Sequence, residues 1–316
     1  MIKITRKERV GVIFTVQKFN SKGEITYQGK PFHNLVLNCG LDLLATMSLY
    51  FATDTCNVGT GTTAPAVTDT GLETRFASSS TLYGTVSYDG TASDPMSIGV
   101  TRVFEFAIGV FSGQPLSEVG LSAGSNSNYF NRQLIKDEYG SPTTITVLVD
   151  EGVRITAESR CYCDMQIADS PETGSFLIGG VTYNYERTVN SYAYTELSTN
   201  FNKIYRQHFG NITGFLASST GLTDLKSEQP DYRSTSTTYN TYTPGDFARE
   251  ATCIFPASVF NGTIKYIGVG YTGASGVYRA ESIFTLTGDT ETPAVLLEKT
   301  NLQELTLVFK REWAAH

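Results

Sequence analysis

The second half of the chain repeats the apolar spacing of its first half. Residues 102–121 recur from position 252 onward, with glycines and apolar side chains at matching places. The offset is 149 residues between Val110 and Val259 and 152 residues between Ile155 and Leu307, a drift that turns of different length produce. Because apolar side chains recur while polar ones change, the repeat predicts a duplicated scaffold and not a duplicated active site.

The length of the chain agrees with two domains. A chain of 316 residues is long enough for two cores, since domains commonly hold about 100–200 residues. Residues 167–175 have the composition of a linker, with Pro171 between small polar residues. We expect a first domain at residues 1–167, beginning with a hairpin that turns at residues 20–23, and a second, repeat-related domain at residues 168–316.

Short runs rich in β-branched and aromatic residues alternate with turns from residue 82 onward. A period of two, as at Val153, Ile155 and Ala157, is typical of strands with one buried face. Residues 34–49 instead contain apolar side chains at the spacing of about two helical turns. The expected fold class is all-β, with two tandem, internally duplicated antiparallel β-sandwich domains and one short helix in the first.

The charge of the chain excludes some classes of partner. Charged residues make up 17% of the sequence, the net charge is -7 and the isoelectric point is about 5.1. Proteins that bind nucleic acid need a basic surface to neutralise its phosphates. No run reaches the roughly 20 apolar residues that span a bilayer, and the first residues do not resemble a secretory leader. We expect synthesis in the cytoplasm, no membrane insertion and no nucleic-acid partner.

The residue types that bind cofactors and metals form no clear pattern. The five cysteines include no CxxC pair, and we expect Cys161 and Cys163 to be buried on one face of a strand. Residues 58–75 contain a Gly-Thr-Gly that suggests a phosphate loop, but no lysine follows in the required place. A surface connection whose glycines allow positive φ explains this segment better. We therefore expect no metal and no cofactor.

Paired carboxylates occur twice, at Asp137 with Glu138 and at Asp150 with Glu151, in both cases beside turn glycines. Such pairs are more often solvated hairpin tips than the opposed acid and base of a glycosidase. The three histidines lie near no nucleophile signature, and no Gly-x-Ser-x-Gly elbow is present. The sequence predicts that the protein is not an enzyme.

Glu118 is the acid that most needs an explanation, because it lies inside the apolar segment 116–121. Its counterpart in the second copy is Tyr266, so its role does not belong to the repeated scaffold. A buried carboxylate is costly unless it is paired or hydrogen-bonded. We expect Glu118 to pair with a cation such as Arg132 or with backbone groups, the alternative being that it faces solvent.

Exposed aromatic and hydroxyl side chains are the candidate contact residues. Tyrosine and tryptophan are enriched at protein interfaces, and tyrosines also stack against sugar rings. Residues 233–244 are rich in Ser, Thr and Tyr and suit either a disordered insertion or a hairpin that exposes tyrosines. Trp313 is expected to close the core of the second half or to insert into a neighbour. The candidate interface residues are Tyr232, Tyr239, Tyr242, Trp313, Thr60, Thr62 and Thr63.

Four motifs in the first half resemble a known family. They are Asn-Leu-Val-Leu-Asn-Cys-Gly-Leu-Asp-Leu-Leu at residues 34–44, the Gly/Thr/Pro loop at residues 58–72, Leu-Ser-Glu-Val-Gly-Leu at residues 116–121 and Tyr-Phe-Asn-Arg at residues 129–132. In this order they resemble a module of tailed-bacteriophage virion proteins, found in tail-fibre, baseplate and collar proteins. The resemblance covers residues 30–163, and the second half joins it through the internal repeat. It implies a structural role in a symmetric assembly and supplies no catalytic residues.

These observations predict a non-enzymatic structural component of a tailed-phage particle, located in the tail, baseplate, collar or fibre attachment of the virion. Its partners would be further copies of the chain and other virion proteins, since sheet edges and low surface charge suit closely packed subunits. An alternative is a receptor- or carbohydrate-binding adhesin module of a fibre that contacts a host surface glycan. A third reading, an enzyme that degrades polysaccharide with Asp137 or Glu138, is the weakest.

Overall fold

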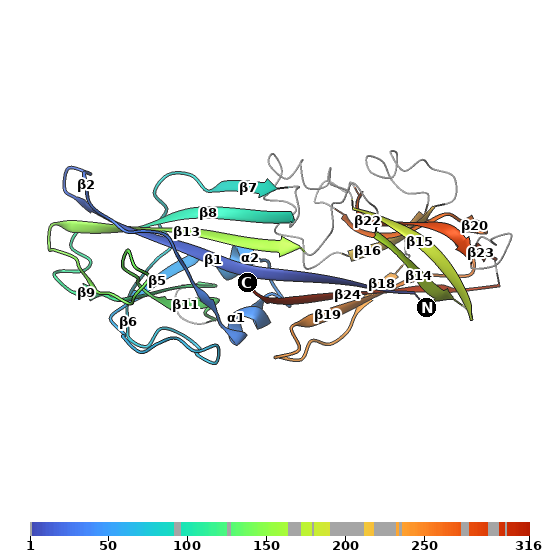
Figure 1. Cartoon of the computed structure of the whole chain (residues 1–316), viewed down its shortest axis with the longest axis horizontal. Helices are drawn as coiled ribbons and strands as arrows, with labels where there is room; N and C mark the ends of the chain where they lie inside the picture. The colour runs from blue at the N-terminus through green and yellow to red at the C-terminus, as the bar shows by residue number, and fades with distance from the viewer. Residues whose placement is uncertain are drawn as a thin grey trace. The chain divides into compact units, whose positions relative to one another are not determined.

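The computed structural model of the protein describes residues 2–91, 96–124, 128–163, 172–178, 180–189, 212–217, 232–233, 236–272, 278–289, 297–300 and 302–316. Strands dominate these residues, and the helices among them are two short ones (Figure 1). The expected all-β class is confirmed. The arrangement of the two halves as tandem, duplicated sandwiches stays a prediction.

The chain forms two compact units, each built from several segments. The N-terminal unit comprises Arg9–Asp89, Ile98–Tyr162 and Trp313–His316, and the C-terminal unit comprises Met1–Glu8, Gly90–Ser97 and Cys163–Glu312. The predicted boundary at residue 167 lies near the start of the longest segment of the C-terminal unit. Each end of the chain, however, belongs to the unit that is built mainly from the opposite half.

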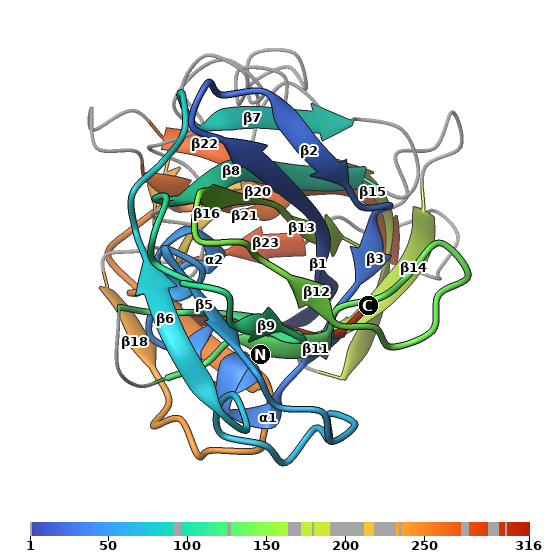
Figure 2. The ribbon, with the colours of Figure 1, turned by 90° about the vertical axis from the view of Figure 1, so that its left-hand side faces the viewer.

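The N-terminal unit contains two sheets in a β-sandwich-like arrangement. Its strands are β1 (Ile2–Asn20), which begins in the C-terminal unit, β2 (Ile25–Gln28), β3 (Phe32–His33), β4 (Leu35–Val36), β5 (Thr55–Gly59), β6 (Arg75–Ser79), β7 (Ser87–Thr91), β8 (Met96–Phe106), β9 (Pro115–Leu116), β10 (Glu118–Ser122), β11 (Asn131–Leu134), β12 (Ile145–Thr146) and β13 (Glu151–Cys163). One sheet has the order β7-β8-β13-β1, with β2 and β3 also paired to β1. The other has the order β4-β11-β10-β5-β6, and β9 pairs with β12. Figure 2, in which this unit faces the viewer, shows β7 and β8 above and β5, β6 and β11 below.

Alternation along β1 explains why it packs as a strand with one buried face. Val10, Val12, Phe14 and Val16 are all buried, and side chains two residues apart point to the same face of a strand. After β1 the chain turns at residues 20–24, where the backbone N–H of Gly23 donates to the carbonyl of Asn20 at 2.9 Å. β1 then pairs antiparallel with β2, which confirms the predicted N-terminal hairpin.

Two short helices lie within and just after residues 34–49, where one helix was predicted. α1 spans Asn38–Leu43 and α2 spans Leu49–Ala52. The hydroxyl of Thr46 donates to the carbonyl of Leu43 at 3.2 Å, a side-chain bond that competes with continued helix. Apolar spacing therefore found α1 and roughly its length, but it did not predict α2, which begins at the end of the segment.

The C-terminal unit also contains two sheets and a short ribbon. Its strands are β14 (Glu172–Ile178), β15 (Val181–Val189), β16 (Ile212–Ala217), β17 (Tyr232–Arg233), β18 (Ser236–Tyr239), β19 (Ala248–Phe255), β20 (Gly262–Ile264), β21 (Tyr266–Thr272), β22 (Tyr278–Asp289), β23 (Leu297–Lys299) and β24 (Leu305–Ala315), the last of which ends in the N-terminal unit. One sheet runs β18-β19-β24-β1, the other runs β14-β15-β22-β21-β16-β17, and β20 pairs with β23. The predicted linker at residues 167–175 lies outside the described residues up to 171, and its remainder belongs to β14.

Strand pairing follows the same order in the two units. Matching β4 with β15, β5 with β16, β6 with β17, β10 with β21 and β11 with β22 reproduces the second sheet, and β14 is an addition at its edge. The register agrees as well. The N–H of Ile135 donates to the carbonyl of Ser117, and the N–H of Leu286 donates to the carbonyl of Lys265, both at 2.8 Å. The apolar repeat in the sequence therefore corresponds to a repeated pattern of strand pairing.

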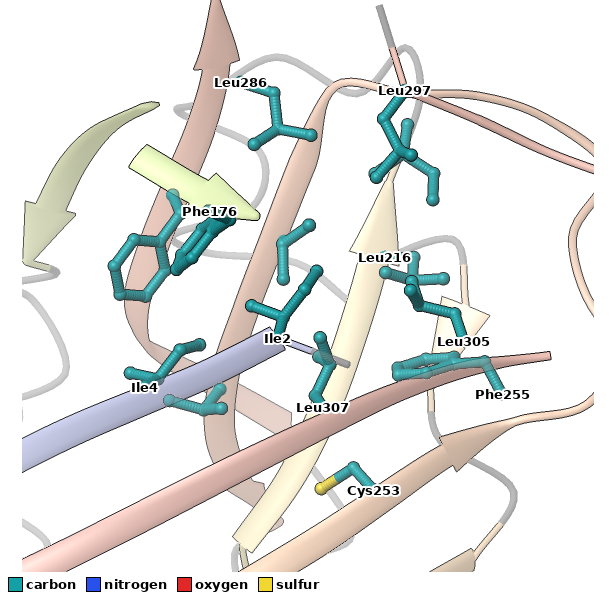
Figure 3. Packing of buried hydrophobic residues seen from close by; sticks show 14 of the residues in the cluster. Ile2, Ile4, Phe176, Leu216, Cys253, Phe255, Leu286, Leu297, Leu305 and Leu307 are labelled. Atoms are coloured by element: carbon teal, nitrogen blue, oxygen red, sulfur yellow. The ribbon is translucent and has the colours of Figure 1, made fainter. Parts of the chain in front are cut away.

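The core of the C-terminal unit lies between its two sheets (Figure 3). Ile2, Leu307 and Phe255 come from one sheet, and Leu216 and Leu286 come from the other. All five residues are at most 2% exposed. The first residues of the chain are therefore part of this core.

Candidate functional site

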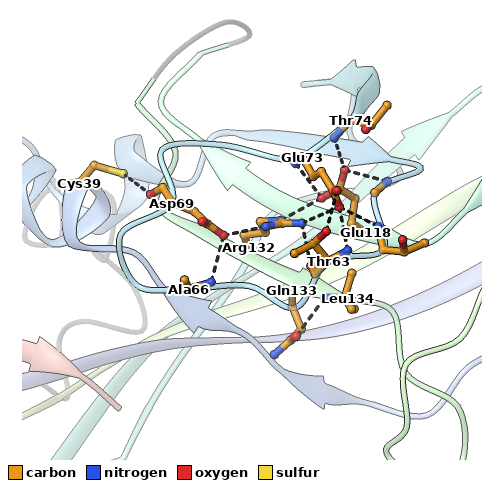
Figure 4. Close-up of polar contacts among 12 residues, drawn as sticks. Cys39, Thr63, Ala66, Asp69, Glu73, Thr74, Glu118, Arg132, Gln133 and Leu134 are labelled. Atoms are coloured by element: carbon orange, nitrogen blue, oxygen red, sulfur yellow. Dashed lines mark hydrogen bonds and ion pairs between the residues drawn. The ribbon is translucent and has the colours of Figure 1, made fainter.

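Glu118 is the centre of a buried polar network in the N-terminal unit (Figure 4). It lies on β10 opposite Gly59 of β5, and its side chain is 0% exposed. Its Oε1 accepts the backbone N–H of Gly61 at 3.1 Å and of Thr74 at 2.8 Å, and its Oε2 accepts the N–H of Glu73 at 3.0 Å. Nε of Arg132 donates to the same Oε2 at 2.9 Å. The predicted pairing of Glu118 with Arg132 and with backbone groups is confirmed.

Arg132, on β11, extends the network across the loop that connects β5 to β6, residues 60–74, called loop 60–74 below. Its side chain is only 4% exposed. Nη1 donates to Oδ2 of Asp69 at 2.6 Å, and Nη2 donates to the carbonyl of Thr63 at 3.0 Å. Nη2 also lies 3.5 Å from Oε2 of Glu73. One guanidinium thus holds three separate points of the loop, which its planar fork of donors allows.

Glu73 and Asp69 fold the loop upon itself. Oε2 of Glu73 accepts the N–H of Thr62 at 2.8 Å and of Thr63 at 2.7 Å, while its Oε1 accepts the hydroxyl of Thr63 at 2.7 Å. Oδ2 of Asp69 accepts the N–H of Ala66 at 3.0 Å. Carboxylates that accept N–H groups replace the secondary structure that the loop lacks.

The network shifts the protonation equilibria of its charged groups. Hydrogen bonds from the hydroxyl and N–H of Thr63 lower the pKa of Glu73. Burial by itself would raise the pKa of Asp69, but the bonds from Ala66 and Arg132 outweigh it and the pKa falls. Burial opposes the charge of Arg132, yet its bonds to Asp69 and Glu118 raise its pKa. The geometry therefore favours the charged form of all three groups.

Two glycines make room for the Glu118 carboxylate. A Cβ at Gly59 would lie 2.4 Å from Oε1 of Glu118, and one at Gly61 would lie 2.6 Å from the same atom. Neither glycine has a positive φ. The expectation that the glycines serve positive φ is therefore wrong for these two positions, where close approach of a side chain requires them.

Four positions in and around this network are filled by a buried cluster at the matching places of the C-terminal unit. Phe215, Ala217, Tyr266 and Ile283 form a small buried cluster there. By strand register these residues match Asn57, Gly59, Glu118 and Arg132. The strand pattern that the two units share thus accepts either an apolar cluster or an ion network at this place, and the network accompanies loop 60–74.

A shallow hollow of about 460 Å³ lies on the loop, lined by loop residues and by Arg132. The Asp69 and Glu73 side chains reach it and are 27% and 38% exposed. Each already accepts bonds from the loop or from Arg132, and Glu118 accepts four. Chemically the arrangement anchors a loop.

The predicted contact residues of this loop lie at its start. Thr60 is half-buried and its N–H donates to the carbonyl of Thr74 at 3.0 Å, whereas Thr62 and Thr63 are exposed. Sequence reasoning missed Asp69 and Glu73, whose signal is a pair of carboxylates within a Gly/Thr-rich loop.

The remaining predicted contact residues are scattered. Tyr239 lies on β18, an edge strand paired with β19, so this part of the tyrosine-rich stretch is ordered sheet. The guanidinium of Arg249 lies 4.7 Å from the Tyr239 ring centroid. Tyr242 is half-buried beyond β18, and only the backbone of Tyr232, in β17, is described. These tyrosines belong to the C-terminal unit, whereas loop 60–74 belongs to the N-terminal unit.

Trp313 occupies a different place from the one expected. It belongs to the N-terminal unit and is 3% exposed, so it neither closes the core of the second half nor presents its ring to a neighbour. Its Nε1 donates to the carbonyl of Leu41 at 2.8 Å. Local sequence patterns do not predict a contact between two residues that are 272 positions apart.

Two further expectations concern single side chains. Cys161 is buried as predicted, whereas the side chain of Cys163 lies outside the described residues. Glu151 is not a solvated hairpin tip, because it is 5% exposed and pairs with Lys18 at 2.8 Å. Within the described parts of the chain, no group of His, Cys, Asp and Glu side chains could hold a metal ion, and no helix is long and apolar enough to cross a membrane.

Comparisons of the chain with protein-family models, with curated proteins and with solved structures find no match.

Proposed function

We propose that the protein is a non-enzymatic structural component of a tailed-phage particle that acts through contacts between subunits. The observation that carries the proposal is the ion network beneath loop 60–74. A buried ion pair seldom stabilises a fold more than apolar side chains of similar volume. The C-terminal unit places apolar residues at the same positions. The network therefore serves the shape of the loop, and a loop of fixed shape suits recognition.

The surface of the loop fits a protein partner. Residues 60–68 include no charged residue and consist of Thr, Gly, Ala, Pro and Val. Val67 is 45% exposed. The centres of protein interfaces are depleted of charge, because charges are costly to desolvate. A preordered loop also loses little conformational entropy on binding.

The placement in a phage particle rests on the resemblance of residues 30–163 to virion modules. Sheet edges such as β6 and β18 add surfaces that neighbouring copies could extend. The tail, baseplate, collar and fibre attachment are all compatible locations in the virion. The partners would be copies of this chain or other virion proteins.

The test combines electron microscopy with solution mass. An antibody against the chain should label intact tailed-phage particles at one fixed place, and the purified chain should form a defined oligomer. Replacing Thr62 and Thr68 by lysine should weaken assembly, whereas the same change at exposed Ser80 and Thr81, outside the loop, should not. Absence from the particle together with a monomer in solution would overturn the proposal.

A further inference from the structure

A second hollow, of about 530 Å³, opens in the N-terminal unit between the β1–β2 hairpin and residues 137–146. This volume is within the range of sites that bind small molecules. The hairpin side supplies Lys18, Tyr27, Gln28 and Lys30, and the opposite side supplies two acids and threonine hydroxyls. No residue of this cleft takes part in the network under loop 60–74.

One wall of the cleft is fixed by a buried ion pair. Nζ of Lys18 donates to Oε2 of Glu151 at 2.8 Å and to the carbonyl of Thr146 at 3.0 Å. Oε1 of Glu151 accepts the hydroxyl of Thr26, on β2, at 2.6 Å. The hairpin is thereby tied to β13 and to the threonine segment, so the two sides of the cleft are held together.

The other wall is a rigid turn. Oδ1 of Asp137 accepts the N–H of Tyr139 and of Ser141, each at 2.9 Å, and the Asp137 N–H donates to the carbonyl of Ser141 at 2.9 Å. The N–H of Thr143 donates to the carbonyl of Ile135 at 2.8 Å. A site with fixed walls loses little entropy when a ligand enters it.

The formal charges of the lining residues sum to zero, since Lys18 and Lys30 lie on one side and Asp137 and Glu138 on the other. A phosphate-rich or strongly basic ligand therefore gains nothing here from net charge. Lys30 and Glu138 are exposed, one on each side. An ammonium group donates hydrogen bonds and a carboxylate accepts them, so the two sides have opposite hydrogen-bonding preferences.

One aromatic ring lines the same cleft. Tyr27 lines it and is half-buried, with its hydroxyl near the backbone of Gly29. An aromatic ring buries apolar surface when a flat partner stacks on it.

We propose that this cleft binds a neutral saccharide. Sugar hydroxyls both donate and accept, which matches Lys30 as donor, Glu138 as acceptor and the threonine hydroxyls as either. The apolar face of a pyranose ring suits stacking on a tyrosine. The inference is independent of the assembly role, and it assigns a ligand class to a surface away from loop 60–74.

The test is saturation-transfer and amide-shift NMR on the full chain with maltotriose, chitotriose and lactose as probes, each at about 10 mM to detect millimolar affinity. We expect at least one probe to shift the amides of Thr143 and Thr144. The double variant Lys30→Gln with Glu138→Gln should weaken that binding about tenfold, because it removes two charge-assisted hydrogen bonds. The variant Tyr27→Ser should weaken it by a smaller factor.

The matched control is Lys22→Gln with Asp150→Asn, which removes one positive and one negative exposed charge outside the cleft. It should bind as the unaltered chain does. The proposal is overturned if none of the three probes shifts these amides, or if the double variant binds as well as the control. Either result would leave the assembly role untouched, because that role is read from oligomer mass and particle labelling.

Discussion

At matching positions of the same strand pattern, the two units place side chains of opposite chemistry. In the C-terminal unit four apolar side chains fill the position between matching strands, and in the N-terminal unit a glutamate and an arginine do so. The apolar version needs only packing, whereas the ionic version needs every carboxylate and guanidinium atom to be matched. The difference teaches that one strand pattern can be filled by plain apolar packing in one unit and by an ion network that contacts a loop in the other.

The largest loss of stability is expected when one member of the ion network is removed. Glu118→Ala leaves Arg132 buried without its central partner and leaves three backbone N–H groups without an acceptor. Removing one member of a buried pair costs about 3–5 kcal/mol of unfolding free energy. Urea unfolding of the full chain, followed by hydrogen exchange in β10 and β11, measures this loss. A loss below about 1 kcal/mol would mean that the network is not buried as described.

The next prediction concerns a variant in which residues of the C-terminal cluster replace the ion network of the N-terminal unit. The triple variant Gly59→Ala, Glu118→Tyr, Arg132→Ile copies three of the four residues of the C-terminal cluster and should recover most of the stability lost in Glu118→Ala. Loop 60–74 should nevertheless exchange its amide hydrogens faster, because Thr74, Gly61 and Glu73 no longer donate to a carboxylate. If the loop stays protected in the graft, the network does not hold it.

The two units also differ in how their last hairpin turn is closed. The N–H of Leu148 donates to Oε2 of Glu151 at 2.9 Å, and at the matching place the N–H of Thr300 donates to Oε1 of Gln303 at 3.4 Å. Burial would raise the pKa of Glu151, but bonds from Lys18 and Thr26 lower it to about 2. Only the glutamate titrates, so only the N-terminal unit should carry this pH dependence.

Because the pKa of Glu151 is depressed on folding, its contribution is present above pH 4.5 and is lost as the pH falls toward 2. We expect it to be on the order of 2–3 kcal/mol at neutral pH. Unfolding of the unaltered chain and of Glu151→Gln should differ at pH 7 and converge near pH 2. Gln303→Ala, the matched change in the other unit, should shift stability equally at both pH values. A constant difference between Glu151→Gln and the unaltered chain would contradict the assignment.

A single added methyl group tests the fit around the carboxylate. Gly59→Ala places a Cβ 2.4 Å from both Oε1 of Glu118 and the carbonyl of Thr74, so the loop has to shift. Overpacking of this kind costs about 1–3 kcal/mol. The C-terminal unit has Ala217 at the matching position, and Ala217→Gly there should cost no more than about 1 kcal/mol. Thermal unfolding of both variants makes the comparison, and equal losses would refute it.

The smallest effect is expected at an exposed ion pair. Lys3 and Glu250 lie 2.7 Å apart in the C-terminal unit, but their side chains are 53% and 33% exposed. Solvent screens such pairs, so Lys3→Ala should change the unfolding free energy by less than about 0.5 kcal/mol. Urea unfolding measures this change. A loss comparable to that of Glu118→Ala would remove burial as the explanation of the contrast.

Local patterns in the sequence were sufficient to predict much of the fold. The period of two along β13 and the regular turn signals were sufficient for the β class, and an acid within an apolar strand was sufficient to pair Glu118 with Arg132. The roles of Asp69 and Glu73 could not be predicted in the same way. Whether a loop carboxylate meets solvent or its own backbone depends on how the loop closes, and spacing does not encode that closure.

The corrected predictions have the same physical origin. Trp313 and Glu151 each bind an element more than 100 residues away in sequence, at Leu41 and Lys18. Gly59 looked like a turn residue because glycine serves both positive φ and close approach, and the sequence does not distinguish the two. Long-range contacts and close packing are therefore where the structure adds most.

The exchange of chain ends between the units has a consequence for biosynthesis. Residues up to Glu8 belong to the C-terminal unit and residues from Trp313 onward belong to the N-terminal unit. A ribosome that has made the whole first half has therefore not yet supplied the last piece of the N-terminal unit, and the opening segment of the chain must wait for strands made much later. Folding that depends on such distant contacts is slow and leaves sheet edges open to other chains meanwhile. Cutting the gene near codon 167 would remove a piece from both products.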